Sequence, residues 1–174
     1  ANAVSGGMQN FSETSVLNAS ATNAVSGGQQ YLYNTSALNV LANNALTKDV
    51  TVNFDNQVGG PGGTLRLNGY STVVGAVRSL SAGSGIIENG GAADSILTID
   101  GSTAGSSSFS GLIRDGGAGR LGLTLVSGTL TLDGVHSYTG PTNVGSGATL
   151  AVNGLIASSQ MLTINGTVAG TGTI

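Results

Sequence analysis

The sequence predicts an all-β parallel solenoid, in which the chain coils and stacks one strand on the next. Three observations carry this prediction. A five-residue unit with apolar residues at its first and third positions occurs five times, a second and longer repeat opens the chain, and the content of charged and aromatic residues is unusually low. A single rung buries too little to stand alone, so we expect each added copy to complete its neighbour by sharing backbone hydrogen bonds.

The five-residue unit predicts a short strand that ends in a turn, because an acid or amide precedes a glycine in every copy. The copies occupy residues 65–69, 97–101, 130–134, 150–154 and 162–166. Asn-Gly and Asp-Gly are also strong hairpin signals, so antiparallel hairpins are the structural alternative. The segments after Gly69 and Gly154 do not mirror the strands before them. We therefore favour parallel stacking.

Composition restricts both the fold and the function. The 174 residues are 39% hydrophobic but only 7% charged and 4% aromatic, with no Trp and no Cys, whereas an average domain is about 25% charged. A thin aliphatic core fits this composition. The net charge is −3 and the five basic residues are scattered, which argues against nucleic-acid binding. No apolar run is long enough to span a membrane as a helix.

The N-terminal fifth holds the more regular repeat. Asn-Ala-Val-Ser-Gly-Gly at residues 2–7 returns at residues 23–28, and the same offset pairs Gln9 with Gln30 and Leu17 with Leu38. We expect 21-residue rungs of a three-sided helix of β-strands here. An α-helix is the competing interpretation of the alanine-bearing stretches, but Asn, Ser and Thr are poor helix-interior residues and Ser-Gly-Gly breaks each copy.

The rest of the chain has the same character with less regular spacing. Residues 48–54 predict a strand with Val50, Val52 and Phe54 inward and Thr51 and Asn53 outward. Residues 58–63 predict a turn, residues 101–108 a protruding loop, and residues 109–115 and 121–126 further strands. Because the last residues stop within a repeat, we expect a longer parent chain, of which this sequence is a mature or excised segment.

Candidate catalytic and ligand motifs have simpler structural interpretations. Residues 117–122 match Gly-x-Gly-x-x-Gly, but a strand rather than a helix follows, so we expect a turn. His136, the only histidine, follows a turn and is interpreted as a solvated loop residue. Asp100 and Asp133 occupy equivalent repeat positions, which suits turn-capping carboxylates better than an acid–base pair. We expect no enzyme activity, no cofactor and no metal site.

Several segments resemble the passenger-associated β-strand repeat of bacterial autotransporters, namely residues 109–116, 128–132, 138–142 and 147–150. The most specific block is Tyr-Thr-Gly-Pro-Thr at 138–142. The two Val-Ser-Gly-Gly-x-Gln copies, at residues 4–9 and 25–30, resemble repeats of AIDA-type self-associating adhesins. The resemblance implies a right-handed single-stranded parallel β-helix, forming one passenger segment over residues 1–174. AIDA-like rungs would cover 1–57 and passenger-associated repeats 58–174.

The resemblance also implies a function. Such passengers are exported through an outer-membrane barrel, which this sequence does not contain, and stay tethered at the bacterial cell surface. There they cause self-association, biofilm growth or attachment to a host receptor or glycan. We expect the N-terminal rungs to present the contacts, at Asn18, Asn34, Thr35, Asn39, Asn43 and Asn44. A passive stalk is the first alternative, and a polysaccharide-active β-helix the second.

Overall fold

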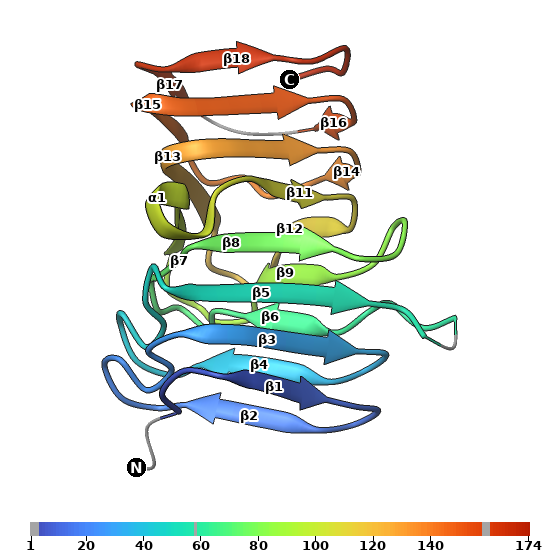
Figure 1. The fold of residues 1–174 in the computed structure, drawn as a ribbon. Helices are drawn as coiled ribbons and strands as arrows, with labels where there is room; N and C mark the ends of the chain where they lie inside the picture. The colour runs from blue at the N-terminus through green and yellow to red at the C-terminus, as the bar shows by residue number, and fades with distance from the viewer. Residues whose placement is uncertain (1–3, 58, 158–160) are drawn as a thin grey trace.

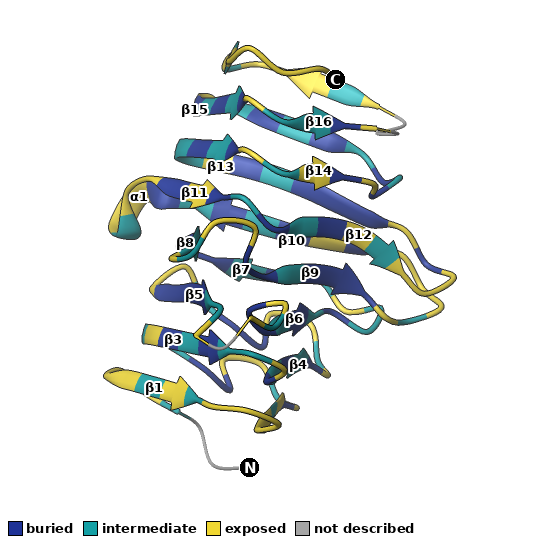
Figure 2. Cartoon of the chain, turned by 90° about the vertical axis from the view of Figure 1, so that its right-hand side faces the viewer, coloured by how far each residue is buried: buried dark blue, intermediate teal, exposed yellow. Residues whose placement is uncertain are grey.

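In the computed structural model, which describes residues 4–57, 59–157 and 161–174, the chain forms a parallel β-solenoid of about seven turns (Figure 1). Every pair of strands within the described residues is parallel. The predicted stack is therefore confirmed, and the hairpin alternative is wrong. The chain runs along the front, returns behind and climbs at each turn, which makes the coil right-handed (Figures 1 and 2).

The solenoid has three faces. The front face is formed by β1 (Met8–Phe11), β3 (Gly28–Tyr33), β5 (Val50–Asp55), β8 (Ala76–Ser79), β11 (Ser107–Phe109), the second halves of β13 (Leu121–Leu132) and β15 (Thr142–Val152), and β18 (Thr167–Ala169). The rear sheet is formed by β2 (Val16–Ala19), β4 (Ala37–Val40), β6 (Thr64–Arg66), β9 (Ile86–Asn89) and β12 (Leu112–Gly116). A two-stranded sheet of β14 (Val135–His136) and β16 (Leu155–Ile156) follows above it.

The third face links the rear sheet back to the front face. It is formed by β7 (Thr72–Val74), β10 (Ser95–Asp100), the first halves of β13 and β15, and β17 (Leu162–Ile164). In the first rungs this face is reduced to the isolated bridges between Val4, Val25 and Leu46. Because β13 and β15 run through the corner between two faces, their ladder shifts register between Leu125 and Ser127.

Rung length follows the predicted pattern. Met8 pairs with Gln29, which is the predicted 21-residue offset. The competing α-helical interpretation is wrong, because the described residues of this region form strands. Later rungs vary in length, since the pairing of Arg78 with Ser108 spans a longer stretch and that of Thr129 with Thr149 a shorter one. Sheet pairing continues past residue 58, because β4 pairs with β6. Val58 itself lies outside the described residues.

The five-residue units do not stack in one column. The copies beginning at Leu130 and Leu150 lie directly over one another on the front face. The copy at Leu65 lies in the rear sheet, and those at Leu97 and Leu162 lie on the third face. The unit therefore encodes a strand followed by a corner, and the loops between copies decide which face it occupies.

Alternation along each strand builds the core. Val50, Val52 and Phe54 of β5 are fully buried, as the sequence predicts. The outward Thr51 and Asn53 are also buried, at 6% and 2% exposed, because neighbouring side chains on the front face cover them. Asn53, for example, donates to Gln29 Oε1 at 3.3 Å. Side chains on the outer side of a strand can therefore be buried as well as those on the inner side, and alternation in the sequence does not reveal this (Figure 2).

Residues 101–108 differ from the predicted loop. Gly101–Ala104 form a single helical turn, α1, and β11 begins at Ser107 (Figure 1). Asp100 caps α1 by accepting a hydrogen bond from the Ser102 N–H at 3.1 Å. Arg78 Nη2 donates to the Ala104 carbonyl at 2.9 Å, so the turn is held against the front face.

Candidate functional site

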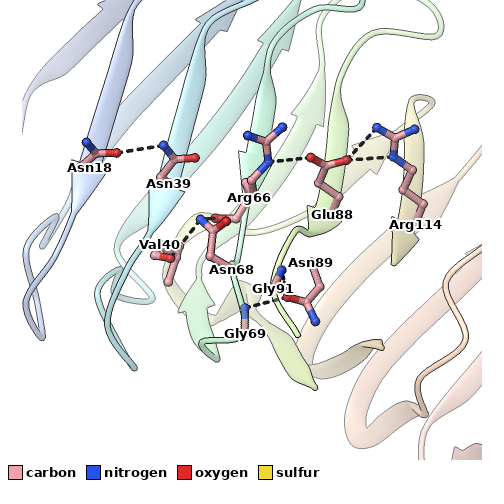
Figure 3. A network of polar contacts seen from close by, with 10 residues as sticks. All are labelled: Asn18, Asn39, Val40, Arg66, Asn68, Gly69, Glu88, Asn89, Gly91 and Arg114. Carbon is pink, nitrogen blue, oxygen red and sulfur yellow. Dashed lines mark hydrogen bonds and ion pairs between the residues drawn. The ribbon is translucent and has the colours of Figure 1, made fainter. Parts of the chain in front are cut away.

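A column of five polar side chains runs along the outside of the rear sheet (Figure 3). We call it the polar column. It consists of Asn18, Asn39, Arg66, Glu88 and Arg114, which pair rung by rung from β2 to β12. Their inward neighbours, such as Leu38 and Leu65, are fully buried, so alternation turns the polar members outward. Successive members are spaced by about 4.8 Å, the distance between strands.

Two contacts order the column. Asn39 Nδ2 donates to Asn18 Oδ1 at 2.8 Å. Glu88, with a side chain 5% exposed, lies between two arginines: Arg66 Nε is 2.6 Å from Oε1 and Arg114 Nη2 is 2.7 Å from Oε2. Burial by itself raises the pKa of the Glu88 carboxyl, but hydrogen bonds and positive charge from both arginines outweigh it and hold this pKa below its ordinary value.

The arginine–glutamate cluster is absent from the predicted site, because the basic residues look scattered in the sequence. The signal that could have found it is local. Arg66, Glu88 and Arg114 each follow a buried aliphatic residue in a rear-sheet strand. If successive rungs are allowed to differ in length, these three residues fall at the same position in neighbouring strands and pair with one another.

Asn34 and Thr35, two predicted site residues, lie at the corner between the front face and the rear sheet. They line a hollow of about 520 Å³ together with Ser12, Glu13, Gln57, Gly59 and Gly60. Asn34 adopts a left-handed backbone conformation, with φ 55, which Asn tolerates better than most residues. Thr35 Oγ1 donates to the Glu13 carbonyl at 2.8 Å. These contacts join successive rungs.

Asn43 and Asn44 lie at the opposite corner, where the rear sheet ends. Asn43 Oδ1 accepts a hydrogen bond from the Ser71 N–H at 2.9 Å. The Asn44 backbone has φ 54, and its carbonyl accepts from the Asn23 N–H at 2.8 Å. The six predicted residues therefore lie in three places, on the rear sheet and at the corners on either side of it, and among them only Asn18 and Asn39 contact each other through their side chains.

His136 contradicts the expectation of a solvated loop residue. It lies in β14 with its side chain turned into the core, fully buried, and its ring centroid is 6.3 Å from that of Phe109. Neither ring nitrogen has a hydrogen-bond partner within the described part of the chain. Burial lowers the pKa of His136 to about 4, although the charge of Asp133 opposes this effect. The residue is neutral at neutral pH.

The Tyr-Thr-Gly-Pro-Thr block has a structural role. Tyr138 is fully buried and its hydroxyl lies 2.8 Å from Thr142 Oγ1. The Asp115 carboxylate accepts from the Thr139 N–H at 3.0 Å and from Thr139 Oγ1 at 2.7 Å. A Cβ atom on Gly140 would lie 2.4 Å from the Leu121 carbonyl oxygen, so only glycine fits. The block fixes a corner between rungs.

The acidic and glycine-rich motifs also serve corners. Asp100 accepts from Ser127 Oγ at 2.7 Å, and Asp133 accepts from Asn153 Nδ2 at 2.9 Å. Asp100 also caps a turn, as predicted, because it accepts from the Ser102 N–H, whereas the Asp133 carboxylate contacts a side chain on the next rung. Residues 117–119 form a bend, but Leu121 and Gly122 already belong to β13, so the turn is shorter than the predicted 117–122. In the described ranges, no three His, Cys, Asp or Glu side chains gather as a metal site would require.

No known protein family, curated protein or solved structure matches this chain. The autotransporter resemblance therefore stays a prediction drawn from the motifs. None of the described helices is long and apolar enough to cross a bilayer.

Proposed function

We propose that this chain is an adhesive segment of a bacterial surface autotransporter, which associates with identical copies on neighbouring cells through the outside of its rear sheet. The observation that carries the proposal is the polar column, which places hydrogen-bonding side chains on five consecutive rungs. Contacts that are weak singly gain avidity when they repeat along a rigid rod. The proposal includes no catalytic step.

The polar column is self-complementary when a second copy lies antiparallel to the first. A twofold axis midway between β6 and β9 sets Arg66 opposite Glu88 of the second copy. The same axis sets Arg114 opposite Asn39. Because Asn39 Oδ1 is itself buried, the guanidinium of the second copy would pack over the Asn39 amide rather than donate to that oxygen. Antiparallel rods are also the arrangement expected between two opposing cells.

Bead clumping tests the proposal. We would couple the purified chain to latex beads and measure the surface density at which the beads clump. Asn39→Lys places a positive charge opposite Arg114 of the second copy, so clumping should require at least about tenfold more protein. The matched control is Asn143→Lys, since Asn143 donates to Thr124 Oγ1 at 3.4 Å on the third face. The control should clump like the parent.

The same assay separates adhesion from a passive stalk. A stalk tolerates replacement of this segment in the parent protein by an unrelated solenoid of the same length, with no change in cell clumping. Equal clumping of the Asn39→Lys and Asn143→Lys variants would rule out the rear sheet as the interface.

Clumping should be lost at high salt, because charged pairs contribute to the contact.

A further inference from the structure

Two tyrosines form an aromatic pair on the outside of the front face. Tyr31 and Tyr33 alternate on β3 with Gln30 and Leu32, which are fully buried, so both rings lie on the outer side of the strand. Their planes are within 12° of parallel, with centroids 6.2 Å apart. In a chain with only 4% aromatic residues, two partly exposed rings on one strand form a distinct surface.

Neighbouring polar groups hold one ring of this pair, that of Tyr31. The Tyr31 hydroxyl donates to Gln29 Oε1 at 2.9 Å, and Asn53 Nδ2 donates to the same oxygen at 3.3 Å. Asn53 is 2% exposed, so these hydrogen bonds connect Tyr31 to a buried side chain. Ordering these side chains before a ligand arrives lowers the entropy lost on binding.

The aromatic pair leads directly into the corner hollow. Asn34 follows Tyr33 in the chain, and the pairing of Phe11 with Leu32 sets Ser12 beside Tyr33 on the preceding rung. Both Asn34 and Ser12 line the hollow of about 520 Å³. Asn34 Oδ1 has no hydrogen-bond partner in the described ranges, but this atom is closed off from solvent. The hollow therefore offers the amide N–H groups of Asn34 and the Ser12 hydroxyl beside two rings.

The local charge restricts the ligand. Glu13 lines the hollow, and Asp55 pairs with Tyr33 on the next rung. Burial, and next the negative charge of Asp55, raise the pKa of the Tyr33 hydroxyl, which agrees with a carboxylate close to that ring. Two carboxylates disfavour an anionic ligand. They accept hydrogen bonds well from hydroxyl groups.

We infer that Tyr31, Tyr33 and the corner hollow form a binding site for an uncharged oligosaccharide. Tyrosine rings supply rigid apolar area that the C–H face of a sugar ring can cover, while Asn, Ser and carboxylate groups bond its hydroxyls. The volume of about 520 Å³ lies in the range of small-ligand sites, about 300–1,000 Å³. This site lies on the front face and at its corner with the rear sheet, whereas the polar column lies on the rear sheet itself, so the inference extends beyond the proposed self-association.

An oligosaccharide array tests the inference. The purified chain would be applied to a printed array of neutral, sialylated, sulfated and uronate-containing oligosaccharides. We expect retention on neutral sugars and none on anionic ones. Tyr31→Ala with Tyr33→Ala should weaken binding of a retained sugar by about tenfold or more. The matched control is Tyr70→Ala, because Tyr70 is 39% exposed at another corner.

A second variant tests the hollow without disturbing the backbone. Asn34→Gly keeps the left-handed conformation and removes the amide. Asn44→Gly makes the same change at the opposite corner, where φ is 54. Asn34→Gly should lose sugar binding while Asn44→Gly keeps it, with equal melting temperatures. Absence of retention on every sugar, preference for anionic sugars, or equal effects of the paired variants would each overturn the inference. Bead clumping by Tyr31→Ala with Tyr33→Ala should stay at the parental level, so the two proposals fail separately.

Discussion

The corner between the front face and the rear sheet is built in two different ways at the two ends of the rod. In the first rungs it is made by Glu13 and Asn34, which are left-handed residues with φ 53 and φ 55 and keep their side chains. In the later rungs it is made by glycines that stack directly on one another. A Cβ atom on Gly134 would lie 2.2 Å from the Gly111 carbonyl oxygen, and one on Gly154 would lie 1.9 Å from that of Gly134.

Because of this difference, the corner in the first rungs can bind a ligand, while the corner in the later rungs serves only packing. A corner with side chains is wide enough to leave the hollow beside Asn34 and Thr35. A corner of stacked glycines offers only backbone, and it leaves no room for a ligand or for another residue type. We therefore expect substitutions in the first rungs to change binding with little effect on stability. Substitutions at the glycine corner should do the reverse.

The largest effect is expected at the glycine corner. Gly134→Ala forces adjacent rungs apart, since no flexible side chain can yield to the new methyl group, and it should lower the free energy of unfolding by more than about 3 kcal/mol. Gly27→Ala is the matched control, because its Cβ would meet no atom closer than 3.8 Å. Urea unfolding measures both. A Gly134→Ala variant as stable as the control would contradict the close approach of Gly134 to the Gly111 carbonyl oxygen.

His136, two residues after the glycine corner, should make the later rungs sensitive to acid. The folded pKa of about 4 lies below the unfolded value of 6.5. The unfolded chain therefore binds a proton first as the pH falls, and stability declines between pH 6.5 and 4 by about 3 kcal/mol. His136→Leu should remove this decline. Melting temperatures across that pH range measure it, and equal pH profiles for parent and variant would contradict the burial of the ring.

Glu88 joins the two regions, because Arg66 and Arg114 contact it from adjacent rungs. Glu88→Gln should cost about 1 kcal/mol at neutral pH, a modest value because both arginines are partly exposed. Since the folded pKa of Glu88 is lowered, its contribution is present above the unfolded pKa and is lost as the pH falls through the folded pKa. Urea unfolding at pH 7 and at successive steps below pH 4.5, the ordinary pKa of a Glu carboxyl, checks this. Loss of the effect already above pH 4.5 would contradict the ion pairs.

The smallest effect on stability is expected at the asparagine corners. Asn34→Gly and Asn44→Gly should each change the free energy of unfolding by less than about 1 kcal/mol, because glycine adopts the same backbone conformation. Thermal melting measures this change. A much larger loss at Asn34 would mean that its side chain supports the corner, and the contrast between the two ends of the rod would then disappear.

Much of the fold could be predicted from the sequence, because stacked rungs repeat their hydrogen-bonding pattern in the chain. The exact repeat of the first rungs and the inward residues of β5 are examples. The burial of His136 could not be predicted, since shifting a strand by one residue reverses which side chains face inward. The Arg66–Glu88–Arg114 cluster was also missed. It depends on loops that bring together residues 22 and 26 positions apart.

The candidate site could be predicted only in part. Asn18 and Asn39 lie in register on one face, because the exact repeat in the first rungs places them at equivalent positions. Asn43 and Asn44 are predicted on the same surface, but both hold a corner, Asn43 through its side-chain oxygen and Asn44 through its backbone carbonyl. An asparagine in a turn and an asparagine on a sheet face look alike in a sequence, and only the register separates them.

The most direct test of the proposed interface is a concentration series followed by two-dimensional ¹H–¹⁵N NMR of the side-chain amide and guanidinium signals. We predict that the signals of Asn18, Asn39 and Arg114 shift as the protein concentration rises, while those of Asn143 and Asn153 stay in place. Shifts confined to Asn143 and Asn153, or no shifts at concentrations where the beads clump, would contradict adhesion through the rear sheet.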